Sequence, residues 1–296
     1  MMLIEKFIEY LKIEKNYSVN TLSAYKKDLI EFQVFINENF DKCVIENVDY
    51  KIIRSWIVLL VNKNLSNRSI NRKVSSLKSF YKFLVKTETI NSSPLIAHSP
   101  LKQSKKIQVP FSKDEIGTLL DSDFFKSDYK GVLQKTIISF FYFTGVRRIE
   151  LINLKTSDIN MNSYTIRIMG KRNKERIIPM LPKLKESISE YLKIKSQEFN
   201  NVISDYLFIS KSGIQLSEKY VYRTVNEYFK LVSPKVKKAP HVLRHSFATH
   251  LINEGADINS VKELLGHSSL SATQVYSHTS MERIKEVFKN SHPRAK

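Results

Sequence analysis

A proline- and lysine-rich break about one third of the way along the chain constrains the fold more than any other feature. Residues 94–110 read PLIAHSPLKQSKKIQVP, with three prolines, three lysines and no acidic residue. Proline lacks a backbone donor and disfavours helix in the residue before it, so regular structure stops here. A length of 296 residues suits about two domains. We therefore predict an N-terminal domain over 1–93, a basic linker over 94–110 and a second domain over 111–296.

Apolar residues before the break recur at helical spacing and predict a four-helix bundle. The second helix is expected to begin at Asn20-Thr21. The fourth carries Arg72, Ser76 and Ser79 on the face opposite its apolar stripe. The positions that define the four apolar stripes are Ile4, Ile8 and Leu11; Leu22, Tyr25, Leu29, Phe32 and Ile36; Ile52, Trp56, Leu59 and Leu60; and Ile70, Val74, Leu77, Tyr81 and Leu84.

The second domain is predicted to be α+β, so the whole chain is mainly α with a small antiparallel sheet. Ser112 and Glu115 match a helix capping box, and 137–143 (IISFFYF) reads as a buried helix. Residues 164–169 alternate in polarity, GKRNKE turns the chain, and 176–180 return, which predicts a hairpin. We expect Tyr206 to Ser210 to add a third strand.

The charge balance favours a polyanionic partner. The chain has 48 Lys+Arg against 29 Asp+Glu, a formal charge of +19 at pH 7. Basic side chains on phosphates release counterions, although a lysine-rich solubilising surface is an alternative explanation. The single cysteine, Cys43, excludes internal disulfides. Apolar runs such as Trp56 to Val61 are far shorter than the ~20 residues that span a bilayer, so we predict a cytoplasmic protein without a membrane partner.

The stretch HVLRHSFATH, residues 241–250, gathers three histidines and an arginine. His241 and Arg244 are three positions apart and share one helical face, while Phe247 belongs to the apolar stripe that anchors the helix. The helix therefore offers an imidazole and a guanidinium together. His241 and His245 also have a spacing found in helical metal sites. That alternative is disfavoured, because HVLRH lacks a glutamate and Arg244 would repel a divalent cation.

The segment TGVRRIEL, residues 144–151, supplies a second arginine. Thr144-Gly145 should break the preceding helix and leave an arginine at the start of the next one, where backbone N–H groups favour anions. Arg147 and Arg148 diverge around a helix, so only one of them can face the site. Glu150 could orient it.

Cationic side chains also crowd the predicted hairpin turn, at Lys171, Arg172, Lys174 and Arg176. A lysine on a tight turn can enter a groove and donate a proton to a leaving alkoxide. The alternative is an ordinary solvated basic turn.

The segment LLGHSSLSATQVYSH, residues 264–278, adds two further groups. Gly266 suits a helix C-cap and places His267 just beyond it. Tyr276 is one of 14 tyrosines, but it lies in a polar segment away from the apolar stripes. Two guanidiniums, a lysine, two imidazoles and a phenol suit transesterification of a phosphodiester through a covalent intermediate. No aspartate pair and no glycine-rich loop points to Mg²⁺ or a nucleotide.

Taken together, these motifs closely resemble those of the tyrosine site-specific recombinases, a phage-integrase-like family, and in particular its Xer branch. The resemblance covers essentially the whole chain, and HVLRHSFATHL followed by ELLGHSSLSATQVYSH is highly specific. It implies an N-terminal SAM-like core-binding bundle that grips DNA and a C-terminal catalytic domain.

The resemblance also implies a role for each site residue. Arg147 and Arg244 would clamp the phosphate, and Lys171 would be the general acid for the 5′-oxygen. His241 would hydrogen-bond the phosphate or assist the nucleophile, and His267 would donate to the phosphate.

Tyr276 would be the nucleophile that forms a 3′-phosphotyrosyl intermediate. The family exchanges strands through a Holliday junction, without a metal ion, ATP or another cofactor. The implied partners are double-stranded DNA with a short inverted-repeat site, a synaptic tetramer of this chain or of this chain with a paralogous recombinase, and a septal DNA translocase. The resemblance implies a cytoplasmic, nucleoid-associated protein that resolves chromosome dimers at a dif-like site.

Further DNA contacts are expected from the bundle, the linker and the hairpin turn. The residues concerned are Arg72, Ser76, Ser79, Lys102, Lys105, Lys106 and Arg172.

The C-terminal stripe of Met281, Ile284 and Phe288 is expected to dock onto a neighbouring subunit, and the alternative is that it caps its own domain. Two residues depart from the family pattern. Ile149 stands where a small polar residue is usual, and Arg172 replaces a glycine. Competing functions are an integrase or transposase of a mobile element, a type IB-like nicking-closing enzyme, and a DNA-binding protein without catalysis.

Overall fold

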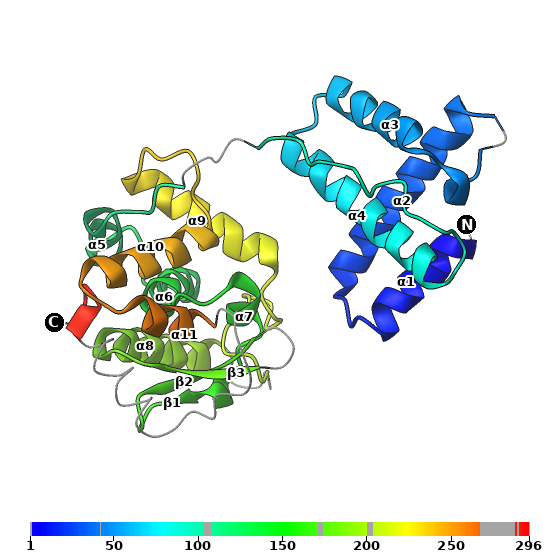
Figure 1. Cartoon of the computed structure of the whole chain (residues 1–296). Helices are drawn as coiled ribbons and strands as arrows, with labels where there is room; N and C mark the ends of the chain where they lie inside the picture. Colours follow the sequence, from blue (N-terminus) through cyan, green and yellow to red (C-terminus); the bar gives the residue numbers. More distant parts are fainter. Residues whose placement is uncertain are drawn as a thin grey trace. The chain divides into compact units, whose positions relative to one another are not determined.

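The computed structural model describes residues 2–41, 43–103, 108–170, 174–199, 204–266, 288 and 290–295. The chain forms two compact units, Met1–Lys106 and Ile107–Lys296. Each has its own apolar core. The expected mainly helical architecture with one small antiparallel sheet is confirmed (Figure 1).

Among the described residues of the first unit, every regular element is a helix or a 3-10 turn. Three of its helices begin at capping side chains, Ser18, Asp49 and Ser66, each of which accepts a bond from a backbone N–H three residues later. The predicted start at Asn20-Thr21 is therefore slightly late, because Ser18 is the cap. The elements are α1 (Met2–Ile13), α2 (Val19–Asn39), the 3-10 turn η1 (Ile45–Asn47), α3 (Tyr50–Asn62) and α4 (Asn67–Lys86).

The first part of the predicted linker lies against the first unit. Leu95 is buried in the core of that unit. The Asn71 side chain on α4 donates to the Leu101 carbonyl at 2.8 Å and accepts from its N–H at 2.9 Å, and Asn67 donates to the Lys102 carbonyl at 2.7 Å. These bonds secure the described residues 94–103 along α4.

A central buried helix organises the second unit. Helix α6 is buried along nearly its whole length and packs against α8 and α10 (Figure 1). The predicted capping box of Ser112 and Glu115 is confirmed at the start of α5. The helices are α5 (Lys113–Asp121), α6 (Tyr129–Thr144), α7 (Arg148–Ile152), the 3-10 turn η2 (Thr156–Asp158), α8 (Pro182–Glu198), α9 (Glu218–Val232), α10 (Pro240–Asn253) and α11 (Ile258–Leu265).

The sheet is an antiparallel meander in the order β1-β2-β3. The predicted hairpin is confirmed as β2 (Thr165–Met169) and β3 (Glu175–Pro179), with Arg167 opposite Ile177. The third strand is β1 (Ile159–Asn160), which pairs with the start of β2.

The prediction of a third strand at Tyr206 to Ser210 is wrong. The Leu207 N–H donates to the Leu154 carbonyl, and among the described residues the run forms only isolated bridges, Tyr206 to Lys155 and Ile209 to Gln215. Leu207, Phe208 and Ile209 are fully buried, and the Phe208 ring contacts Tyr191 of α8. This apolar run is therefore buried by helix packing and not by strand pairing.

Across the described residues, each helix is too short or too polar to span a lipid bilayer.

The turn after α6 places the next helix and depends on one glycine. Gly145 has φ of 60°, a left-handed conformation that ends α6. A Cβ on Gly145 would lie 2.4 Å from Cδ1 of Phe247, which belongs to α10. The turn therefore requires glycine for both its backbone and its contact with α10.

We predict that Gly145→Ala lowers the free energy of unfolding by about 2–5 kcal/mol, the sum of left-handed strain and a steric overlap in the core. Gly255→Ala is the matched control. Gly255 also has a positive φ, 89°, but nothing lies within 4 Å of its added Cβ. Its loss should be about 1–2 kcal/mol, from strain alone. Urea unfolding followed by circular dichroism measures both, and equal losses would contradict the steric explanation.

Candidate active site

The first predicted clamp arginine sits at the junction between α6 and α7. Arg147 is the N-cap of α7, directly after the Gly145 turn. Its backbone N–H and its guanidinium Nη1 both donate to the Glu150 carboxylate, at 2.8 and 2.6 Å. Glu150 is buried, whereas the Arg147 side chain keeps 39% of its surface exposed. Arg147 is thus held in place on one side and open to solvent on the other.

Its neighbour points elsewhere. Arg148 forms an ion pair with Glu218 at the start of α9. The expectation that only one of the two arginines can face the site agrees with this divergence. Ile149, the departure from the family pattern, is exposed and leaves the Arg147–Glu150 contact intact.

Helix α10 contributes the second guanidinium. Arg244 is half-buried and donates from Nη1 to the Gly145 carbonyl and from Nη2 to the Leu265 carbonyl, both at 2.6 Å. Burial, together with the nearby Arg147 cation, lowers the pKa of Arg244 to about 10. The group remains charged at neutral pH, so two cations are held close together in a partly desolvated place.

The carboxyl end of α11 is where these cations meet. The last carbonyls of a helix lack partners within the helix and carry the negative end of its dipole. Three successive carbonyls there each accept from a guanidinium. The bonds are Leu264 to Arg176 Nε at 2.8 Å, Leu265 to Arg244 Nη2 at 2.6 Å and Gly266 to Arg147 Nη2 at 3.2 Å.

Arg176 on β3 is a member of this cluster whose role the sequence did not reveal. It was visible only as one of four cations near the hairpin turn. Its side chain is 4% exposed and forms a bidentate ion pair with Glu150, at 3.1 and 2.7 Å. Burial alone would raise the pKa of Glu150, but bonds from Arg176 and Arg147 hold it below its ordinary value. Glu150 is therefore an anion among three guanidiniums.

His241 lies one helical turn before Arg244, exposed near the start of α10. Partial burial lowers the pKa of His241, and the Lys237 and Arg148 cations lower it further. A neutral imidazole near pH 7 can both donate and accept a hydrogen bond.

The other two histidines of the stretch serve differently. His245 is exposed, whereas His250 is buried and its Nδ1 lies 3.2 Å from the Tyr142 hydroxyl of α6.

Several predicted residues lie outside the described residues, and their placement stays a prediction. They are Lys171, Arg172, His267, Tyr276, Lys105 and Lys106.

The described part of the C-terminus packs on its own unit. Phe288 is buried and contacts Phe247, and the His292 ring stacks on Phe143. Burial lowers the pKa of His292 to about 4. For Phe288 the structure therefore agrees with the alternative, packing within its own domain. Met281 and Ile284 lie outside the described residues.

The predicted DNA contacts on α4 require one correction. Ser76 is fully buried and donates to the Asp28 carboxylate of α2 at 2.7 Å, so it is not available to a phosphate. Arg72 donates to both Asp28 oxygens, at 2.5 and 2.9 Å, yet its side chain is 49% exposed. Ser79 is partly exposed, and Lys102 is exposed. Among these, Arg72, Ser79 and Lys102 remain predicted contacts.

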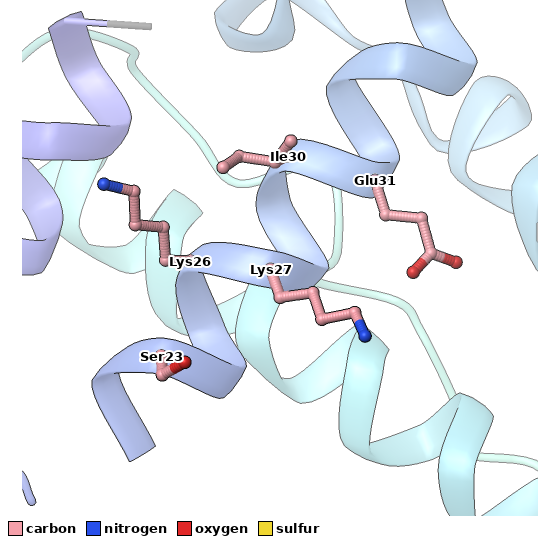
Figure 2. Close-up of a pocket in the computed structure, with 5 residues that line it drawn as sticks. All are labelled: Ser23, Lys26, Lys27, Ile30 and Glu31. Atoms are coloured by element: carbon pink, nitrogen blue, oxygen red, sulfur yellow. The ribbon is translucent and has the colours of Figure 1, made fainter. Parts of the chain in front are cut away.

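Helix α2 carries a hollow of about 490 Å³ (Figure 2). One helix supplies its lining, and Lys26 within it is ion-paired with Glu5 at 2.8 Å. Its lining belongs to the first unit, whereas the described catalytic candidates Arg147, His241 and Arg244 belong to the second. The lining residues are Ser23, Lys26, Lys27, Ile30 and Glu31.

Two guanidiniums bound to one helix end, with an imidazole one helical turn before Arg244 on α10, suit the binding of a phosphodiester. Comparison with known families agrees. Residues 111–283 match the phage integrase family, and residues 4–88 match the phage integrase N-terminal SAM-like domain. The chain belongs to the phage integrase family of tyrosine recombinases, enzymes that cut DNA and transfer its strands.

Similar proteins narrow the class to the Xer branch. Tyrosine recombinase XerC of Bacillus pumilus is 38% identical over 302 residues, which cover 99% of this chain and 97% of that protein. XerC of Staphylococcus carnosus is 35% identical over 293 residues, with 99% and 97% covered. A XerH recombinase bound to palindromic difH substrate in a post-cleavage complex is 25% identical, with a TM-score of 0.74 and 97% and 84% covered.

We predict that the His241 ring titrates below 6.5, the ordinary histidine value, because burial and two neighbouring cations disfavour its charged form. Lys237→Gln should raise the midpoint, since one cation is removed. NMR titration of the ring protons measures this, with His241→Gln to assign the signal. A midpoint above the ordinary value, or one that falls in Lys237→Gln, would contradict the assigned electrostatics.

Proposed function

We propose that this protein recombines DNA at a specific site through a 3′-phosphotyrosyl intermediate formed by Tyr276. The Tyr276 hydroxyl gives its proton to the neutral His241 imidazole as its oxygen attacks the phosphorus, the bond from phosphorus to the 5′-oxygen breaks, and Lys171 gives that oxygen a proton. Attack by the 5′-hydroxyl of a second strand reverses these steps and releases the tyrosine. The phosphotyrosyl bond conserves the phosphodiester energy, so no nucleotide hydrolysis is needed.

One observation carries the proposal. Arg147, which lies 119 residues before Gly266, and Arg244, which lies 21 residues before Leu265, converge on the last carbonyls of α11. The sequence continues from Gly266 directly into His267, and Tyr276 follows nine positions later. A paired cation at that point would stabilise the charge that develops on the phosphate during attack. His241 and His267 would add hydrogen bonds to the same oxygens.

We further propose chromosome dimer resolution at a dif-like inverted repeat as the biological task. Support comes from the XerC relatives, matched over nearly their full length, and from the XerH complex with a palindromic difH substrate. The active assembly would be a tetramer on the nucleoid, formed by this chain alone or with a paralogous recombinase, with a septal DNA translocase as activator.

The first test is covalent capture. The protein should form an adduct with a nicked inverted-repeat duplex selected by binding from a random pool, because a nick lets the 5′-hydroxyl fragment leave. Denaturing gels without metal or reductant detect the adduct, which should be absent in Tyr276→Phe. An adduct that persists in that variant would overturn the assignment of the nucleophile.

The second test separates the two neighbouring arginines. Arg147→Ala and Arg244→Ala should each slow cleavage by about 100- to 1000-fold with a much smaller loss of DNA affinity, because their bonds strengthen in the transition state. Arg148→Ala is the control and should cleave nearly as fast as the wild type, because Arg148 is paired with Glu218. Single-turnover rates and gel-shift titrations measure both quantities. Equal losses of affinity and rate in Arg244→Ala would count against its role in the transition state.

Mapping bound genomic sites distinguishes the biological alternatives. One site near the replication terminus supports dimer resolution, whereas sites at the ends of a mobile element support integration.

A further inference from the structure

We propose that Arg176 is a positioning residue of this active site. It balances the charge of Glu150 and ties that carboxylate to the end of α11, so that Arg147 presents its full positive charge to the DNA phosphate. The inference rests on the proposed roles of Arg147 and Arg244.

Arg176 itself is too buried to touch DNA. Its side chain is 4% exposed, and all three of its side-chain nitrogens donate to described protein groups. Nε donates to the Leu264 carbonyl, while Nη1 and Nη2 donate to the two oxygens of Glu150. One planar group thereby joins β3, α7 and α11. Any effect of Arg176 on catalysis must pass through the groups that it holds.

Glu150 is shared between two arginines. Each of its oxygens accepts once from Arg176 and once from Arg147. A single negative charge thus faces two positive charges, with the Arg244 cation nearby. If Arg176 were absent, the carboxylate would be neutralised by Arg147 alone. The clamp would then lose the excess charge that attracts a phosphate.

The geometry requires arginine at this position. A guanidinium can donate a parallel pair of bonds to a carboxylate and a third bond at an angle, whereas a lysine has one nitrogen. Gly266 accommodates the group, because a Cβ there would lie 3.1 Å from Nη1 and 3.2 Å from Cδ of Arg176. The absence of a side chain at Gly266 lets the arginine pack against the helix end.

The experiment compares Arg176→Met, Arg176→Lys, Glu150→Gln and the double variant Arg176→Met/Glu150→Gln in the full chain. Arg167→Met is the matched control, because Arg167 lies on the same hairpin but is half-exposed and pairs with Asp158. The readouts are the rate of adduct formation on the selected nicked duplex, the affinity for that duplex, and the melting temperature.

Arg176→Met should slow adduct formation by about 100-fold, with affinity within about threefold of the wild type. Arg176→Lys should react at a rate between those of Arg176→Met and the wild type, since lysine keeps the charge without the paired bonds. The double variant should be faster than Arg176→Met, because Glu150→Gln removes the unbalanced charge. Arg167→Met should react like the wild type.

The pH dependence supplies a readout that a loss of folding stability would not change. In Arg176→Met, Glu150 stays buried but loses its main partner, so its pKa should rise. Arg147 and Arg244 are the cations that still face it. As pH rises between about 5 and 8, Glu150 should lose its proton and neutralise Arg147. The ratio of variant to wild-type rate should then fall. In the double variant this ratio should stay constant.

Wild-type rates in Arg176→Met would overturn the inference. The inference would also be overturned if the rate ratio did not depend on pH and the double variant reacted more slowly than Arg176→Met. Arg176 would then serve stability alone. If the wild type forms no adduct on the selected duplex, the proposed function fails. A competent wild type with an equally competent Arg176→Met variant overturns only this inference.

Discussion

Three guanidiniums bound to three successive carbonyls at the end of α11 hold the catalytic unit's site together. As the last carbonyls of a helix, those of Leu264, Leu265 and Gly266 lack partners within α11 and carry the negative end of its dipole. Each arginine comes from a different element, so a single helix end brings together β3, α10 and the α6–α7 junction. The cations satisfy the helix end, and the helix end reduces their mutual repulsion.

The same cluster places three positive charges close together, an arrangement that is unfavourable unless other groups offset their repulsion. Glu150 supplies one buried negative charge for Arg147 and Arg176, and among the described residues Arg244 bonds only to carbonyl groups. The site therefore retains an excess of positive charge, which an anion such as a phosphate would neutralise. Burying cations without enough counter-charge costs stability, and an anion bound at this place would offset that cost.

Local patterns predicted most of the fold and failed where tertiary packing decides. The four N-terminal helices, the capping box of α5 and the β2–β3 hairpin follow from apolar spacing and turn residues. The run Tyr206 to Ser210 resembles a strand, but its apolar residues are buried by helices. Its helical position placed Ser76 on the surface, yet it is buried and its hydroxyl donates to Asp28 on another helix. Both the helices that bury this run and the Asp28 partner of Ser76 are distant in the sequence.

The sequence by itself determined the family, predicted the pieces of the site and named Arg147 as its inward arginine, because these depend on short motifs and helical spacing. Tertiary structure alone decided what holds each arginine in place: Arg147 meets Glu150, while Arg148 meets Glu218 on α9. It also decided the place of Arg176, whose partners lie 26 and 88 residues away along the chain. Such contacts arise from the packing of distant elements, and no local periodicity encodes them.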